Sequence, residues 1–117
     1  MRDYTKLDAF KLSNDLVLEV NRQTSQFSKF ELYGLTSQIR RAIISVPSNI
    51  VEGNYRNSQK EYYNFLEIAF ASLKESRYQM NLASRLNYLE LKDFQSCDEK
   101  FQRIEHVLFA LVRSMKC

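Results

Sequence analysis

The sequence predicts an all-α protein, more closely an antiparallel up-down-up-down four-helix bundle. Only two glycines and one proline interrupt its 117 residues, and apolar residues make up 44% of the chain. Few helix breakers combined with many apolar residues favour long helices around one core. The apolar residues recur at alternating steps of three and four, and no segment keeps the period of two that indicates a strand. This length suits one core and is short for two, so we expect a single domain over residues 1–117.

Each expected helix carries its own apolar stripe. The helices are expected at about residues 7–27, 35–54, 59–87 and 91–115. The stripes contain Phe10, Ser13, Val17, Val20, Thr24 and Phe27; then Leu35, Ile39, Ala42, Ile43, Val46 and Ile50; then Tyr62, Leu66, Ala69, Leu73, Ser76, Met80 and Ala83; and last Phe94, Cys97, Phe101, Ile104, Leu108, Leu111 and Met115. Stripes of this spacing pack along one another in helix bundles.

Local signals place the ends of the helices. The stretch Ser58–Glu61, "SQKE", has the form of a capping box that begins the third helix. Gly34 and Gly53 bracket the second helix. The connections between the four segments are short, so consecutive helices should be antiparallel neighbours.

Pro47 lies in the middle of the second expected helix. An interior proline removes one backbone donor and crowds the preceding turn, at a cost of about 3 kcal/mol. The helix could therefore break into two pieces or continue with a kink. The apolar stripe keeps its phase across the proline, from Ile43 through Val46 to Ile50, which favours a kinked continuous helix.

The second helix also has apolar side chains away from its core stripe. Ile44 and Val51 share a second face, joined by Pro47. We predict that Ile44, Pro47, Val51 and Tyr55 form an oligomer interface, because apolar patches outside a core mark interfaces. Other residues off the stripes are Tyr63, Phe70, Val107 and Val112. The alternative is that these side chains only widen the core-facing stripe.

Positive charge gathers around the same helix. Arg40, Arg41, Arg56 and Lys60 are opposed there only by Glu52, and the net charge of the chain is +3. A basic patch of this kind can contact phosphates, so these four cations are candidate nucleic-acid-binding residues. Alternatively, the arginines pair with carboxylates across a subunit interface or lie on a solvated face.

No motif indicates catalysis, a cofactor or a metal. His106 is the only histidine, and there is no Glu-x-x-His pair of the kind that di-iron bundles need. Cys97 lies on a core stripe, and its spacing from Cys117 fits no zinc motif. Nucleophile elbows and glycine-rich phosphate loops are also missing. We therefore expect that the protein is not an enzyme and that it needs no cofactor or metal.

The sequence further predicts a cytoplasmic protein with no membrane partner. Its N-terminus lacks the apolar run of a signal peptide. The longest strictly apolar stretch, Val107–Val112, is far shorter than the roughly 20 residues of a membrane-spanning helix.

A long central stretch resembles a known family. The stretch Tyr33–Glu75, "YGLTSQIRRAIISVPSNIVEGNYRNSQKEYYNFLEIAFASLKE", is similar to the small four-helix-bundle proteins encoded in intervening sequences of bacterial 23S ribosomal RNA genes. The stretch Ala83–Leu89, "ASRLNYL", extends the resemblance to the exit of the third helix. The chain departs from the family at Phe10, where a tryptophan is common.

This resemblance implies an antiparallel four-helix bundle that assembles as a homo-oligomeric ring, commonly a pentamer. The family is also similar in fold to the accessory variability protein of diversity-generating retroelements, which associates with a reverse transcriptase and nucleic acid. The resemblance thus implies an accessory or scaffold protein with RNA, DNA or a reverse transcriptase-like partner. The alternative is a purely structural protein-interaction oligomer without a nucleic-acid role.

Overall fold

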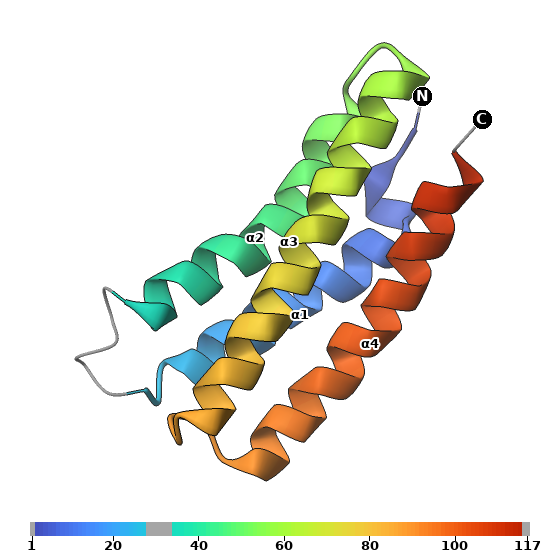
Figure 1. Ribbon diagram of the computed structural model, residues 1–117. Coiled ribbons are helices and arrows are strands. Elements are labelled where there is room, and N and C mark those ends of the chain that lie inside the picture. Colours follow the sequence, from blue (N-terminus) through green and yellow to red (C-terminus); the bar gives the residue numbers. More distant parts are fainter. Residues whose placement is uncertain (1, 28–33, 116–117) are drawn as a thin grey trace.

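The computed structural model describes residues 2–27 and 34–115, and these form an all-α four-helix bundle, as the sequence predicts (Figure 1). A short 3-10 helix, η1, precedes the bundle. The elements are η1 (Tyr4–Lys6), α1 (Asp8–Thr24), α2 (Leu35–Asn54), α3 (Gln59–Arg85) and α4 (Leu91–Ser114). Among the described helices, none is both long and apolar enough to cross a membrane.

The four helices form a square in cross-section. Each helix packs against the next along the chain, and α1 also packs against α4. Within the described residues the backbones of the diagonal pairs, α1 with α3 and α2 with α4, do not approach each other closely. Figure 1 shows α3 and α4 in front of α1. The α1–α2 side and the α3–α4 side are therefore opposite faces of the bundle.

The ends of α2 and α3 are set by local interactions. α2 has the bounds expected from the sequence, and Ser58 caps α3 by accepting a hydrogen bond from the Glu61 backbone N–H at 3.0 Å. α3 ends two residues earlier than expected because Asn87 takes the left-handed conformation, with φ of 63°. The amides of Asn87 and Tyr88 then bond to carbonyls of the last helical turn, which closes the helix as a Schellman motif.

The core follows the expected stripes. Every stripe residue of α3 is buried, and in α4 the four central ones, Cys97, Phe101, Ile104 and Leu108, are buried too. The outer stripe residues of α4, Phe94, Leu111 and Met115, are only half-buried because they lie near the ends of the bundle. Burial of such side chains supplies about 1.5–3 kcal/mol each, so the stripes account for most of the driving force for folding.

α2 passes through Pro47 as one continuous helix, and Figure 1 shows its axis turning between the first and second half. The kinked continuous helix expected from the sequence is therefore confirmed. Beyond the kink, Gly53 lies against α3: a Cβ added there would be 2.8 Å from the Cβ of Phe65. Only glycine allows the two helices to approach this closely.

Candidate interaction surfaces

The first surface is the outer side of α2. Ile44 is 53% exposed and Tyr55 is 62% exposed, while Val51 is half-buried. A shallow hollow of about 560 Å³ lies here, lined by Ser48, Val51, Glu52, Tyr55 and Arg56. We call this surface, with Ile44, the α2 ridge. Three of the four residues proposed for an oligomer interface, Ile44, Val51 and Tyr55, thus offer apolar surface to a neighbour.

Pro47, the fourth residue assigned to that interface, is buried inside the bundle. It lies four residues after Ile43, so one turn of helix places it on the core-facing side. Its side chain therefore offers no surface to another subunit. Pro47 instead acts on the shape of α2, whose axis turns between its first and second half.

The second surface is a groove between α3 and α4. It has a volume of about 370 Å³ and is lined by Tyr63, Glu67, Phe70, Phe109, Val112 and Arg113. The rings of Phe70 and Phe109 lie 5.8 Å apart, and Phe109 is 51% exposed. Neighbouring apolar side chains that form a continuous exposed patch can mark a surface that contacts another molecule. We call this surface the α3–α4 groove.

The structure separates the four candidate nucleic-acid-binding cations. Arg40 turns toward α1, where its Nε donates to Thr24 Oγ1 at 3.0 Å and its Nη2 donates to the Asn21 carbonyl at 3.4 Å. Arg41, one residue later, is exposed, and within the described residues it has no ion-pair partner. Arg40 therefore joins two helices, and Arg41 is the one available to a ligand.

The other two cations lie at the far end of α2. Arg56 pairs with Glu52 at 2.5 Å, and its guanidinium lies 4.7 Å from the ring centroid of Phe65. Lys60 is exposed at the start of α3. Thirteen helical positions separate Arg41 from Asn54 at the end of α2, or about 20 Å at 1.5 Å per residue, and Arg56 lies beyond that end. The four cations consequently form two separate groups.

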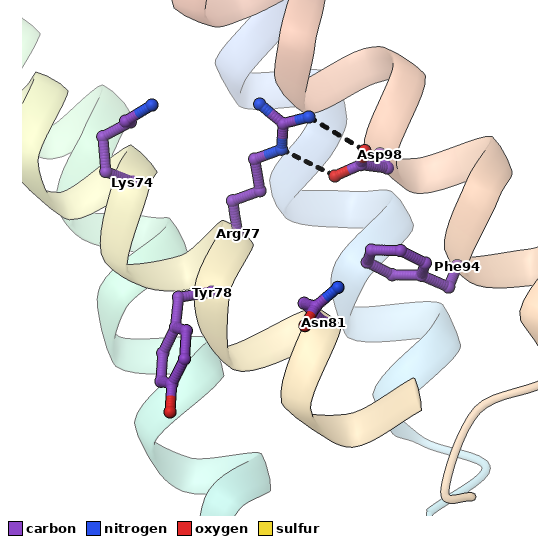
Figure 2. A pocket seen from close by; sticks show the side chains of 6 residues that line it. All are labelled: Lys74, Arg77, Tyr78, Asn81, Phe94 and Asp98. Atoms are coloured by element: carbon purple, nitrogen blue, oxygen red, sulfur yellow. Dashed lines mark hydrogen bonds and ion pairs between the residues drawn. The ribbon is translucent and has the colours of Figure 1, made fainter. Parts of the chain in front are cut away.

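A charged network between α3 and α4 was not anticipated from the sequence. Arg77 donates to both carboxylate oxygens of Asp98, at 2.6 and 2.9 Å (Figure 2). It also donates to Glu105 at 2.7 Å. Lys74 completes it with a 2.8 Å bond to Glu105. These carboxylates raise the pKa of Arg77 above its already high ordinary value, against the lowering effect of burial. The guanidinium therefore stays charged, and each of its three nitrogens donates to a carboxylate.

The network lines a hollow of about 340 Å³, together with Tyr78, Asn81 and Phe94. Figure 2 shows Arg77 directed at Asp98 across the space between the two helices. Because its strongest cation is already paired, the hollow has little capacity to hold an anion. Its residues serve mainly to join α3 to α4.

Reactive side chains in the described part of the chain occupy structural positions. Cys97 is buried with its Sγ 4.0 Å from Glu19 Oε1, and burial raises the pKa of the thiol, with Lys100 opposing the shift. A thiol held in its protonated form is a poor nucleophile. His106 is exposed on α4. No group of three or more potential metal ligands occurs among the described residues.

Arg2 has a structural role that the sequence did not indicate. Its Nη2 donates to the carbonyls of Asn54 and Arg56, at 3.1 and 2.8 Å, and its guanidinium lies 4.2 Å from the ring centroid of Tyr62. It thereby satisfies carbonyls at the C-terminal end of α2, which has no basic residue in its own last turn. That lack of a basic residue at the end of α2 is the one sequence signal that could have suggested a cation from elsewhere in the chain.

Comparisons with known proteins agree with this fold. A solved structure of a Bacteroides thetaiotaomicron protein of unknown function, from the S23 ribosomal protein family, superposes with a TM-score of 0.82. The two share 20% sequence identity, over 89% of this chain and 97% of the other. No curated protein matches the sequence. The family model described as "23S rRNA-intervening sequence protein" matches residues 5–110, and the chain therefore belongs to that family.

Proposed function

We propose that this protein is a non-catalytic scaffold that assembles from identical chains into a ring, and that the ring carries nucleic acid or a ribonucleoprotein partner. The family resemblance implies a pentamer. It also implies that a reverse transcriptase-like protein is the kind of enzyme such a scaffold accompanies. The apolar surface of the α2 ridge is the observation that carries the proposal.

Support for assembly comes from the exposure of that surface. Ile44 and Tyr55 are both more than half exposed, although each is a large apolar or aromatic residue in a well-formed helix or at its end. Burying such side chains against a neighbour would gain about 25 cal/mol for each Å² of apolar surface removed from water. Aromatic side chains at the centre of a contact commonly supply much of its free energy.

Support for nucleic-acid contact comes from Arg41 and Lys60. Both are exposed, and within the described residues neither has an ion-pair partner. In one chain two cations would bind phosphates only weakly. Repetition of both around a ring would multiply the contacts on one strand, which raises affinity without any new kind of site.

The alternative, a purely structural oligomer, is favoured by the engagement of the other two cations. Arg40 is bonded to α1 and Arg56 is paired with Glu52. Two of the four candidate cations therefore already have contacts within the chain. A scaffold that binds only proteins would not require these cations to bind phosphates.

Light-scattering mass after size exclusion, with absorbance at 260 and 280 nm, tests assembly first. We expect a mass near five times the 13.9 kDa of the chain. Fluorescence anisotropy with a labelled single-stranded RNA, over a range of salt concentrations, tests the second part. Arg41→Gln combined with Lys60→Gln should weaken binding, and the salt slope should fall by about 0.7 for each phosphate that is no longer neutralised. Arg103→Gln, which removes an exposed cation from α4, is the matched control.

The outcomes separate the two candidate functions. A ring that binds RNA in the parent but not in the double variant supports the proposed scaffold for nucleic acid. A ring that never binds RNA leaves the purely structural oligomer. A ring that binds RNA equally in all variants overturns Arg41 and Lys60 as the phosphate contacts. A monomer would overturn both.

A further inference from the structure

We infer that residues 2–6, which we call the strap, hold Tyr55 in place on the α2 ridge, so that the ridge makes a strong contact only while the strap is docked. The inference rests on the proposed function, because the α2 ridge is the surface that carries the proposed assembly. It assigns two positioning residues, Arg2 and Tyr4, which lie far from the ridge in sequence and reach it through Tyr55.

Tyr55 is not fixed in place by α2 alone. It follows the last residue of the helix, with φ of −95° and ψ of 3°, and its side chain is 62% exposed. Its amide bonds to the Glu52 carbonyl at 3.2 Å. Helix ends open more easily than helix interiors. The orientation of the Tyr55 ring therefore depends on contacts from outside α2.

The strap supplies those contacts. Arg2 Nη2 donates to the carbonyls of Asn54 and Arg56, at 3.1 and 2.8 Å. These are the residues on either side of Tyr55. Asn54 Nδ2 donates in return to the Arg2 carbonyl at 3.3 Å. The ring of Tyr4 lies 6.2 Å from that of Tyr55 at an interplanar angle of 67°, an edge-to-face arrangement in which rings attract each other. The strap thus holds the backbone on both sides of Tyr55 and contacts its ring.

The strap itself is held by few contacts, so it can leave the bundle while the helices stay folded. No residue of η1 is buried, and its remaining ring contacts are those of Arg2 with Tyr62 and of Tyr4 with Phe10. A surface segment of this kind opens at a lower free-energy cost than the whole fold. Within the described residues, Asn54 Oδ1 is buried without a hydrogen-bond partner. Undocking exposes Asn54 to water, which offsets part of the lost contacts.

A docked strap strengthens the contact of the ridge by ordering it in advance. A partner that binds a mobile aromatic side chain must immobilise it, and this entropic cost is avoided when the side chain is already fixed. For one side chain the cost corresponds to up to about a tenfold change in dissociation constant. Undocking of the strap should therefore weaken the proposed assembly while α1 to α4 remain folded.

Dilution of the assembly with light-scattering detection tests the inference, because it gives the concentration at which half of the assembly has dissociated. Arg2→Met removes the donor to the two carbonyls, and Tyr4→Ala removes the ring that contacts Tyr55. We expect each to raise that concentration about tenfold. Tyr4→Phe keeps the ring, and Lys6→Met removes an exposed cation from the strap, so both should behave as the parent. Circular dichroism and urea denaturation check that every variant keeps the bundle.

A double-mutant cycle shows whether the strap acts through Tyr55, which a merely structural role would not require. Tyr55→Ala, at an exposed position, should itself weaken assembly. If the strap works by holding Tyr55, Tyr4→Ala should cause no further loss once Tyr55 is replaced. Losses that add would mean that the strap acts on another part of the molecule, and they would overturn the inference.

Two further outcomes separate this inference from the proposed function. Unchanged dissociation of Arg2→Met and Tyr4→Ala would overturn the strap as a control on the ridge and leave the proposed assembly standing. A parent that is monomeric at every concentration would overturn the proposed function, and the inference with it.

Discussion

α3 packs against two neighbours by different physical means. Toward α2 the contact is close and uncharged: Gly53 meets Phe65 and Tyr62, and the hydroxyls of Ser45 and Ser72 lie 2.9 Å apart. Toward α4 the contact is made by charged side chains, through the network of Arg77, Asp98, Glu105 and Lys74. Beside the apolar core that all four helices share, α3 therefore has a contact with no room for larger side chains on one side and paired charges on the other.

This difference determines which substitutions each contact tolerates. A close contact between helices fails when any side chain is enlarged, because dense packing leaves no room for it to move. A contact made by long charged side chains adjusts to changes of volume, but it fails when one charge is removed and its partners are left unpaired.

The largest effect should come from enlarging Gly53. In Gly53→Leu the new side chain meets the Cβ of Phe65, an atom fixed close to the backbone of α3, so the two helices must separate. We expect a loss of about 3 kcal/mol in the free energy of unfolding, the upper range for overpacked sites. Urea denaturation followed by circular dichroism measures it. Asn64→Leu, at an exposed position of α3, should change stability by less than about 0.5 kcal/mol.

Removal of Arg77 tests the charged contact. Arg77→Met leaves Asp98 unpaired at 27% exposure, and it leaves Glu105, at 12% exposure, with Lys74 as its remaining ion-pair partner. We expect a loss of about 2 kcal/mol, less than the roughly 3–5 kcal/mol of a fully buried pair because water still reaches these groups. Arg103→Met removes an exposed cation from α4 and should have little effect. Equal losses in the two variants would show that the network contributes nothing specific to stability.

The fold could be predicted because its signals are local. The stripe of α3 and the bounds of α2 depend on residues a few positions apart, and the sequence displays all of them. The charged network was missed because Arg77 and Asp98 are separated by 21 residues. Such a pair meets only when α3 and α4 take one particular register, and that register is set by packing of the whole core.

The interaction surfaces could be predicted only in part, for a geometric reason. Arg40 and Arg41 are neighbours in sequence, yet successive helical positions point about 100° apart, so one faces α1 and the other faces water. Pro47 was assigned to the outer face although it lies one turn from Ile43 on the core side. Phe109, an exposed aromatic residue of the groove, lies off the core stripe of α4, directly after Leu108. It is not among the off-stripe residues named from the sequence.

A smaller effect should come from the two serines of the close contact. Ser72→Ala removes the partner of the Ser45 hydroxyl, which keeps a hydrogen bond from Asn49 Nδ2 at 2.8 Å. We therefore expect a loss of about 0.5–1 kcal/mol, the net value of one ordinary hydrogen bond. A double-mutant cycle with Ser45→Ala measures the coupling between the two hydroxyls. Ser96→Ala, at an exposed position of α4, is the control, and additive losses would mean that the serines do not interact.

The smallest effect is a response to alkaline pH to which Tyr62, in the close contact, contributes. Burial raises the pKa of Tyr62 above its ordinary value, and the nearby charge of Arg2 only partly opposes this. The folded chain thus holds the phenolic proton at a pH where the unfolded chain has released it. This contribution to stability is complete below about pH 10, the ordinary pKa of tyrosine, and falls as the pH rises further.

Urea denaturation at about pH 8, 9.5 and 10.5, a range that spans the ordinary pKa of tyrosine, measures this response. Tyr62→Phe has no phenolic proton to lose, so its stability should fall less steeply over the highest interval than that of the parent. Tyr78→Phe, at an exposed position of the same helix, should follow the parent. If Tyr62→Phe and the parent decline in parallel, the alkaline response comes from elsewhere in the chain. A separation between them assigns it to the contact of α2 with α3, where Tyr62 packs against Gly53, and distinguishes that contact from the ion-paired one on the other side of the helix.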